Sequence, residues 1–135
     1  MKQTKISITS TEVGKLTFPI SAIEAPTIIL ITEAKVRPRY DSKEQIADSC
    51  AKIALSGVDL KLAQLMKQQG LDIQGLVPIY IELVGDEPFL KQFKPEKMVN
   101  TVIDVRNAQV ALRWVSRGSS GSWGGLKLII SEFSP

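Results

Sequence analysis

Apolar and polar residues alternate along much of the chain, and the alternation is clearest between Ala108 and Trp114. Even-numbered positions there are apolar, and a period of two is that of a β-strand with one face in a core. The opposite face carries Arg113 and Arg117. A loop of sequence GSSGSWGG follows, and a further strand is expected over residues 126–133. The pattern predicts two strands joined by a flexible loop.

A second alternating segment covers residues 27–40. It begins with the β-branched run TIILIT, which favours a strand. Lys35, Arg37 and Arg39 then share one face, together with Glu33. Pro38 places the far end of this strand at a sheet edge or beyond its hydrogen-bonded part.

The middle of the chain contains the one expected helix. Residues 41–45 (DSKEQ) predict a hairpin turn, whereas residues 46–58 fit either a strand or a helix. Asp59 is a favourable N-cap, apolar residues then recur at helical spacing over 60–69, and Gly70 is typical of a helix end.

A strand is expected over residues 76–84 (LVPIYIELV), followed by a break at GDEP. Asp86 and Glu87 within that break are interpreted as a turn. Residues 89–100 (FLKQFKPEKMVN) are interpreted as a basic connector.

The next strand starts near Thr101, and its inward residues carry odd numbers as far as Val105. From Ala108 onward the inward residues carry even numbers. This change of parity at Arg106 and Asn107 predicts a β-bulge or a tight turn.

These elements predict a mainly β protein: a β-barrel with one short helix. Four or five strands and one helix in about a hundred residues fit an OB-like five-stranded barrel if the helix lies earlier than usual. We assign residues 27–135 to this OB-like domain. Residues 1–26 are expected to form an N-terminal arm or an edge strand.

The composition is that of one folded domain, with 135 residues, of which 44% are hydrophobic and 23% charged. Cys50 is the single cysteine, so an internal disulfide is excluded, and we expect it to be a small buried apolar residue. No apolar run of about 18 residues or signal-peptide pattern occurs. We therefore expect a cytoplasmic protein without membrane contact.

The chain contains no histidine, which excludes Ser/His and Cys/His nucleophile arrangements and histidine-based zinc sites. The loop GSSGSWGG lacks the Gly-Lys-Ser/Thr of a nucleotide-binding P-loop. No paired carboxylates or metal cluster stand out. We expect no enzyme activity, no cofactor and no metal.

Charge is unevenly distributed along the chain. Residues 1–45 hold seven Lys or Arg and five Asp or Glu, a net charge of +2. Residues 46–90 hold three against six, a net charge of −3, and residues 91–135 hold seven against three, a net charge of +4. Basic strand faces beside aromatic residues are typical of proteins that bind single-stranded nucleic acid. The candidate binding residues are Lys35, Arg37, Arg39, Tyr40, Arg113, Arg117, Trp123 and Lys127.

Each candidate also has a simpler structural explanation. Trp114 shares the apolar face of its strand, so a core position is favoured over a stacking platform. Trp123 is either exposed for stacking or folded back over the barrel. The cations of residues 35–39 would also discourage edge-to-edge aggregation of strands.

Three segments carry a family resemblance: RPRYDSKEQ, KQFKPEKMVN, and RNAQVALRWV with its Gly-rich loop and GLKLIISEF. Over residues 27–133 the chain resembles OB-fold single-stranded-DNA-binding or accessory proteins of phages, plasmids and conjugative elements. The resemblance implies binding of single-stranded DNA with little sequence preference. Further implied partners are replication or transfer proteins, or a second copy of the chain. The alternative hypothesis is a structural or assembly protein that docks a protein partner through the same barrel.

Overall fold

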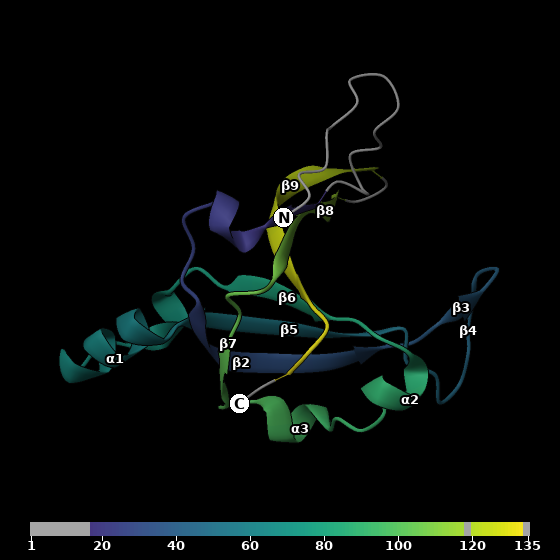
Figure 1. Ribbon diagram of the computed structural model, residues 1–135, viewed down its shortest axis with the longest axis horizontal. Coiled ribbons are helices and arrows are strands. Elements are labelled where there is room, and N and C mark those ends of the chain that lie inside the picture. The colour runs from purple at the N-terminus through teal and green to yellow at the C-terminus, as the bar shows by residue number, and fades with distance from the viewer. Residues whose placement is uncertain (1–16, 118–119, 134–135) are drawn as a thin grey trace.

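The structure is a computed structural model that describes residues 17–117 and 120–133; for residues 114–117, 120, 122 and 123 it describes the backbone alone. Strands dominate the fold, and the helices are short (Figure 1). In chain order the elements are β1 (Thr17–Pro19), the 3-10 turn η2 (Ile20–Ala22), β2 (Ile28–Arg37), β3 (Tyr40–Asp41), β4 (Glu44–Gln45), β5 (Lys52–Asp59), α1 (Leu60–Gln68), the 3-10 turn η3 (Ile73–Gly75), β6 (Ile79–Leu83), α2 (Glu87–Leu90), α3 (Pro95–Met98), β7 (Val102–Asp104), β8 (Gln109–Arg117) and β9 (Ser120–Ile130).

The described residues form one mixed seven-stranded sheet in the order β1-β8-β9-β6-β5-β2-β7, and β3 and β4 form a separate two-stranded hairpin. Neighbouring strands of the large sheet are antiparallel. The exception is the parallel pair β6 and β9, in which Tyr80 lies beside Lys127. The expected mainly β class is confirmed.

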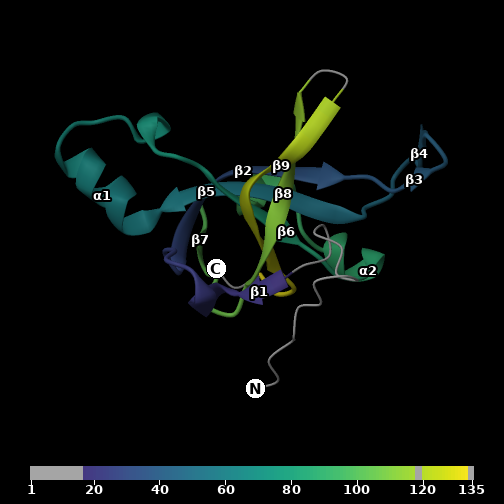
Figure 2. The ribbon, with the colours of Figure 1, turned by 90° about the horizontal axis from the view of Figure 1, so that it is seen from above.

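The large sheet is strongly curled. Asp104 ends β7 at one side of the sheet, and Gln109 begins β8, the second strand from the other side. The chain from Asp104 to Gln109 can span at most about 18 Å. In a flat sheet, β7 and β8 would be five strand spacings apart, or about 24 Å. The sheet must therefore bend, and both views show β8 and β9 crossing β2, β5 and β6 (Figures 1 and 2). Within the described residues, β1 and β7 are not paired with each other, so the sheet is open and an OB-like barrel is not confirmed.

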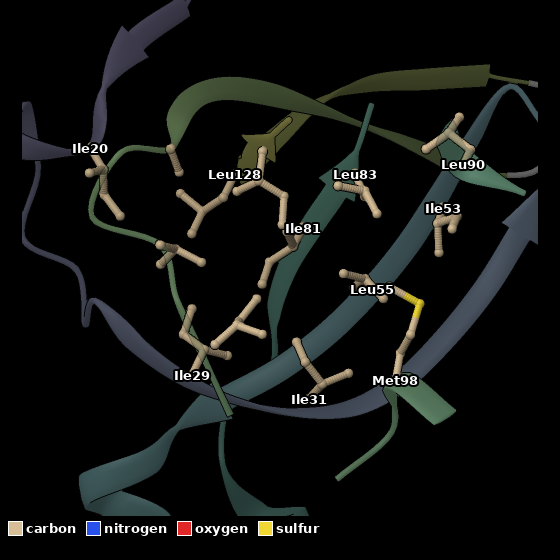
Figure 3. Close-up of a cluster of buried hydrophobic side chains, with 14 of the residues drawn as sticks. Ile20, Ile29, Ile31, Ile53, Leu55, Ile81, Leu83, Leu90, Met98 and Leu128 are labelled. Carbon is tan, nitrogen blue, oxygen red and sulfur yellow. The ribbon is translucent and has the colours of Figure 1, made fainter. Parts of the chain in front are cut away.

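The hydrophobic core lies inside the curl (Figure 3). Ile53 and Ile81 on the central strands are at most 1% exposed. Leu90 of α2 and Met98 of α3 pack into the same cluster. Burial of each such side chain stabilises the fold by about 1.5–3 kcal/mol. Cys50 belongs to this cluster, so its prediction as a buried apolar residue is confirmed.

Helix α1 begins and ends where the sequence predicts. The carboxylate of Asp59 accepts a hydrogen bond of 3.0 Å from the backbone amide of Lys61, which satisfies a free donor of the first turn. Gly70 follows the helix with a φ of 71°. Residues 46–58 were expected to form either a strand or a helix. The strand is correct for the second half of this segment, which forms β5.

The chain turns sharply between β7 and β8. The backbone amide of Ala108 donates to the carbonyl oxygen of Val105 at 2.9 Å. The backbone amide and the side chain of Arg106 both donate to the carboxylate of Asp104. The tight turn predicted from the change of parity is therefore confirmed. The hairpin predicted at residues 41–45 is also confirmed, as β3 and β4.

Three secondary-structure predictions are wrong. The supposed turn at Asp86 is a helix start, because its carboxylate accepts a hydrogen bond of 3.0 Å from the amide of Phe89 at the beginning of α2. The supposed connector 89–100 contains α3. Most of the supposed loop GSSGSWGG belongs to β9, which pairs with β8, and its residues 118–119 lie outside the described residues. Pairing with the β-branched and aromatic positions of β8 overrides the low strand propensity of glycine.

The N-terminal segment is described only in part. Residues 17–19 form β1, an edge strand that pairs with the start of β8. Residues 1–16 of the expected arm lie outside the described residues.

Candidate functional site

A groove of about 690 Å³ crosses the outer face of the curled sheet. Its floor lies on β5, where Ala54 and Ser56 point away from the core because they alternate with the buried Ile53 and Leu55. These two side chains are small, whereas the side chains around them are long. The long side chains that line the groove are Glu33, Lys35, Arg37, Tyr40, Lys52, Tyr80, Glu82, Arg113 and Lys127.

The groove is cationic. Five of its lining residues carry a positive charge and two carry a negative charge, Glu33 and Glu82, which leaves a net charge of +3. The cations come from four strands, and β2 and β5 are far from β8 and β9 in sequence. Lys35 and Arg37 lie on β2, and the others lie on β5, β8 and β9. The order of the sheet places these strands around one hollow.

One acid lies among the cations. The Oε2 atom of Glu82 lies 2.8 Å from Nζ of Lys52 and 3.0 Å from Nζ of Lys127. The side chain of Glu82 is only 18% exposed. Burial raises the pKa of Glu82, but the hydrogen bonds and charges of the two lysines outweigh burial, so the pKa lies below its ordinary value. Glu82 is therefore charged at neutral pH and holds both ammonium groups.

An arginine and a tyrosine stack in the same groove. The guanidinium carbon of Arg113 lies 3.6 Å from the centre of the Tyr80 ring, which is a cation–π contact. The pair joins β8 to β6 across β9. It offers a flat, cationic surface of the kind on which nucleic-acid bases stack.

A second hollow of about 600 Å³ continues from the first and shares Glu33, Ser56 and Tyr80 with it. Among the described residues, the rest of its lining carries one acid, Asp72, and no cation. The cations therefore concentrate at one end of a longer channel.

Five of the eight residues predicted from the sequence line the cationic groove. Tyr40 is the most exposed of the aromatic residues whose exposure is described, at 63%. The others are Lys35, Arg37, Arg113 and Lys127.

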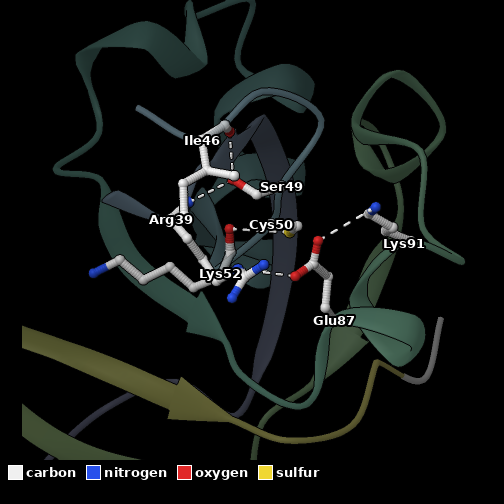
Figure 4. Close-up of polar contacts among 7 residues, drawn as sticks. All are labelled: Arg39, Ile46, Ser49, Cys50, Lys52, Glu87 and Lys91. Carbon is white, nitrogen blue, oxygen red and sulfur yellow. Dashed lines mark hydrogen bonds and ion pairs between the residues drawn. The ribbon is translucent and has the colours of Figure 1, made fainter. Parts of the chain in front are cut away.

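Arg39 does not join this groove. Its Nε atom lies 2.9 Å from the carboxylate of Glu87, which also contacts Lys91 at 3.3 Å. The backbone amide of Arg39 donates to the hydroxyl of Ser49 at 2.8 Å. Figure 4 shows Arg39 directed toward Glu87, while the amine of Lys52 extends away from this ion pair. Arg39 thus links the strand end to α2.

The side chains of Arg117 and Trp123 lie outside the described residues. Their backbones lie in β8 and β9. Trp123 is therefore a strand residue, not a loop residue, and its Cα pairs with that of Trp114.

The sequence candidates omitted four of the long side chains that line the groove: Glu33, Lys52, Tyr80 and Glu82. Alternation in the segment 76–84 already placed Tyr80 and Glu82 on one face, so a signal for both was present. Their proximity to Lys127, 45 residues away in sequence from Glu82, depends on the parallel pairing of β6 and β9.

Among the described residues, no group of three or more Cys, Asp or Glu side chains is placed to hold a metal ion. No described helix is long and apolar enough to cross a membrane. Comparison with known proteins gave no match to a protein-family model, to a curated protein or to a solved structure.

Proposed function

We propose that the protein binds single-stranded DNA through the cationic groove, with little preference for sequence. The observation that carries this proposal is that five cations and two tyrosines converge on the cationic groove. They come from strands β2, β3, β5, β6, β8 and β9. Scattered surface cations would carry no such argument.

The stacking surface of the groove favours a single strand over a duplex. Lysine and arginine side chains contact phosphates, whereas the Arg113–Tyr80 pair presents a stacking surface. A base can reach that surface only when it is not enclosed in a duplex. Stacking accepts every base, because each has a π face, so the expected sequence preference is small.

A role in a phage, plasmid or conjugative element, with replication or transfer proteins as partners, rests on the sequence resemblance alone. The OB-like relationship rests on the same resemblance and on the curl of the sheet, because OB proteins also bind strands on a curved β-face.

Salt-titrated binding of a labelled oligothymidine, measured by fluorescence anisotropy, tests this proposal. If three to five phosphates are neutralised, the plot of log affinity against log salt has a slope of about −2 to −3.5. The double variant Lys35→Gln/Arg37→Gln removes two of these contacts, so we expect weaker binding and a slope about 1.4 less steep.

The matched control is Lys61→Gln/Lys67→Gln on α1, which removes the same charge at exposed positions that do not line the groove. We expect its slope to equal that of the wild type. Equal weakening by both double variants would show that net charge, and not the groove, drives binding.

A second candidate function is docking of a protein partner in an assembly. It is favoured by exposed apolar side chains on and after α1, where Leu65, Leu71 and Val77 are 52%, 58% and 85% exposed. Substituting all three by Ser would abolish docking of this kind and leave oligothymidine binding unchanged.

A further inference from the structure

The position of Glu82 is unfavourable for a simple phosphate-binding surface. The strands of the groove follow the order β2, β5, β6, β9 and β8, and Glu82 lies on the middle one. The acid therefore lies at the centre of the cations and not at their rim. Any phosphate that approaches Lys52 or Lys127 meets a carboxylate already bonded to both ammonium groups.

The three other cations are arranged differently. Lys35 and Arg37 lie on β2, whereas the guanidinium of Arg113, on β8, reaches across β9 and lies over Tyr80 on β6. In the described residues, neither Lys35 nor Arg37 forms an ion pair, and Arg113 stacks on Tyr80. The groove thus has two cations on β2, a guanidinium stacked on Tyr80, and two ammonium groups whose charge is partly offset by one shared carboxylate.

We propose that Glu82 is a specificity-determining residue that excludes condensed phosphates from the centre of the groove. A condensed polyphosphate carries its charges on phosphoryl groups joined by single bridging oxygen atoms, so it needs a compact cluster of free cations. A nucleic-acid strand separates its phosphates by sugars and presents uncharged bases between them. Such a strand can bind Lys35 and Arg37 while a base stacks on the Arg113–Tyr80 pair beside the acid.

The proposal rests on the proposed function for its biological meaning, but its physical content can be tested separately. The probe is inorganic tripolyphosphate, and the variant is Glu82→Gln, which keeps the size of the side chain and removes its charge. Because charge-assisted hydrogen bonds are strong, two released ammonium groups raise the tripolyphosphate affinity by at least about tenfold in isothermal titration calorimetry. The affinity for oligothymidine rises less, so the preference for the strand falls.

Glu33→Gln is the matched control, because Glu33 also lines the groove and forms no ion pair with a described residue. A gain in tripolyphosphate affinity for Glu82→Gln no larger than for Glu33→Gln would overturn the proposal. Failure of the wild type to bind oligothymidine, together with the expected gain for Glu82→Gln, would refute the proposed function and leave the role of Glu82 intact.

A second comparison applies even if Glu82→Gln does not fold. Lys127→Gln removes a cation that Glu82 already holds, whereas Lys35→Gln removes one outside that ion-pair cluster. Lys35→Gln is therefore expected to weaken oligothymidine binding more than Lys127→Gln. Equal or greater weakening by Lys127→Gln would overturn the proposal.

Discussion

Gly57 lies on β5 directly against β2, and substituting it tests the packing of these two strands. A Cβ atom at this position would lie in hard contact with Cγ2 of Ile29 and 2.7 Å from the carbonyl oxygen of Leu30. The side chain of Ile29 is fully buried, and the oxygen belongs to the backbone of the neighbouring strand. Neither atom can move without displacing β2.

Overpacking of this kind costs about 1 to 3 kcal/mol. Because one of the two contacts is with backbone, we expect Gly57→Ala to lie at the upper end, with a free energy of unfolding lower by about 2 to 3 kcal/mol. For a domain of this size, that corresponds to a fall in Tm of about 7 to 10 °C. Thermal unfolding followed by circular dichroism measures this change.

Gly75→Ala is the matched control, because a Cβ atom there would have no heavy atom within 4 Å. Its Tm is expected to stay close to that of the wild type. If the Tm of Gly57→Ala equalled that of Gly75→Ala, β2 and β5 would not approach each other as described.

Three further predictions concern stability. Ile81→Ala empties a fully buried site between β5 and β9 and is expected to lower the free energy of unfolding by about 2 to 5 kcal/mol in urea titration. Asp86→Ala removes the cap of α2 and should cost about 1 kcal/mol in the same assay, whereas Asp86→Asn should cost less. The pKa of Glu82 in the folded state lies below its ordinary value of 4.5. The charge of Glu82 therefore stabilises the fold at a pH above 4.5, and this stabilisation is lost as the pH falls through the lower pKa of the folded state. Glu82→Gln should accordingly flatten the dependence of the urea midpoint on pH below about 4.5; an unchanged pH dependence would contradict the assigned ion pairs.

Local patterns were enough to place much of the groove on the correct faces of strands. Alternation put Lys35 and Arg37 on the outer face of β2, because side chains of a strand alternate whatever the strand pairs with. The capping preference of Asp59 likewise marked the start of α1. Both features are decided within a few residues of the chain.

The composition of the site depends on pairing that local patterns do not encode. Tyr80 and Lys127 meet because β6 and β9 are parallel neighbours, a choice made by the packing of the whole sheet. Arg39 continues the alternation of Lys35 and Arg37, yet it pairs with Glu87 because α2 begins beside it. The short α2 and α3 were missed because four residues are too few to show a helical period.

The open sheet differs from the expected barrel for a related reason. The expectation counted four or five strands, but the glycine-rich segment before Leu126 extends β9, and β1 adds an edge beyond β8. Alternation predicted a strand from residue 126 but not its glycine-rich first half, and it left residues 1–26 as either an arm or an edge strand.

Nuclear magnetic resonance titration of the isotope-labelled protein with unlabelled oligothymidine tests the central claim most directly, because it locates the contact on the chain. The account predicts that the backbone amide signals that shift belong to β2, β5 and β6 around Lys35, Ser56 and Tyr80, with those of α1 unmoved. Shifts confined to α1 and the segment after it, or no shifts at low salt, would contradict the assignment of the groove as the DNA-binding site.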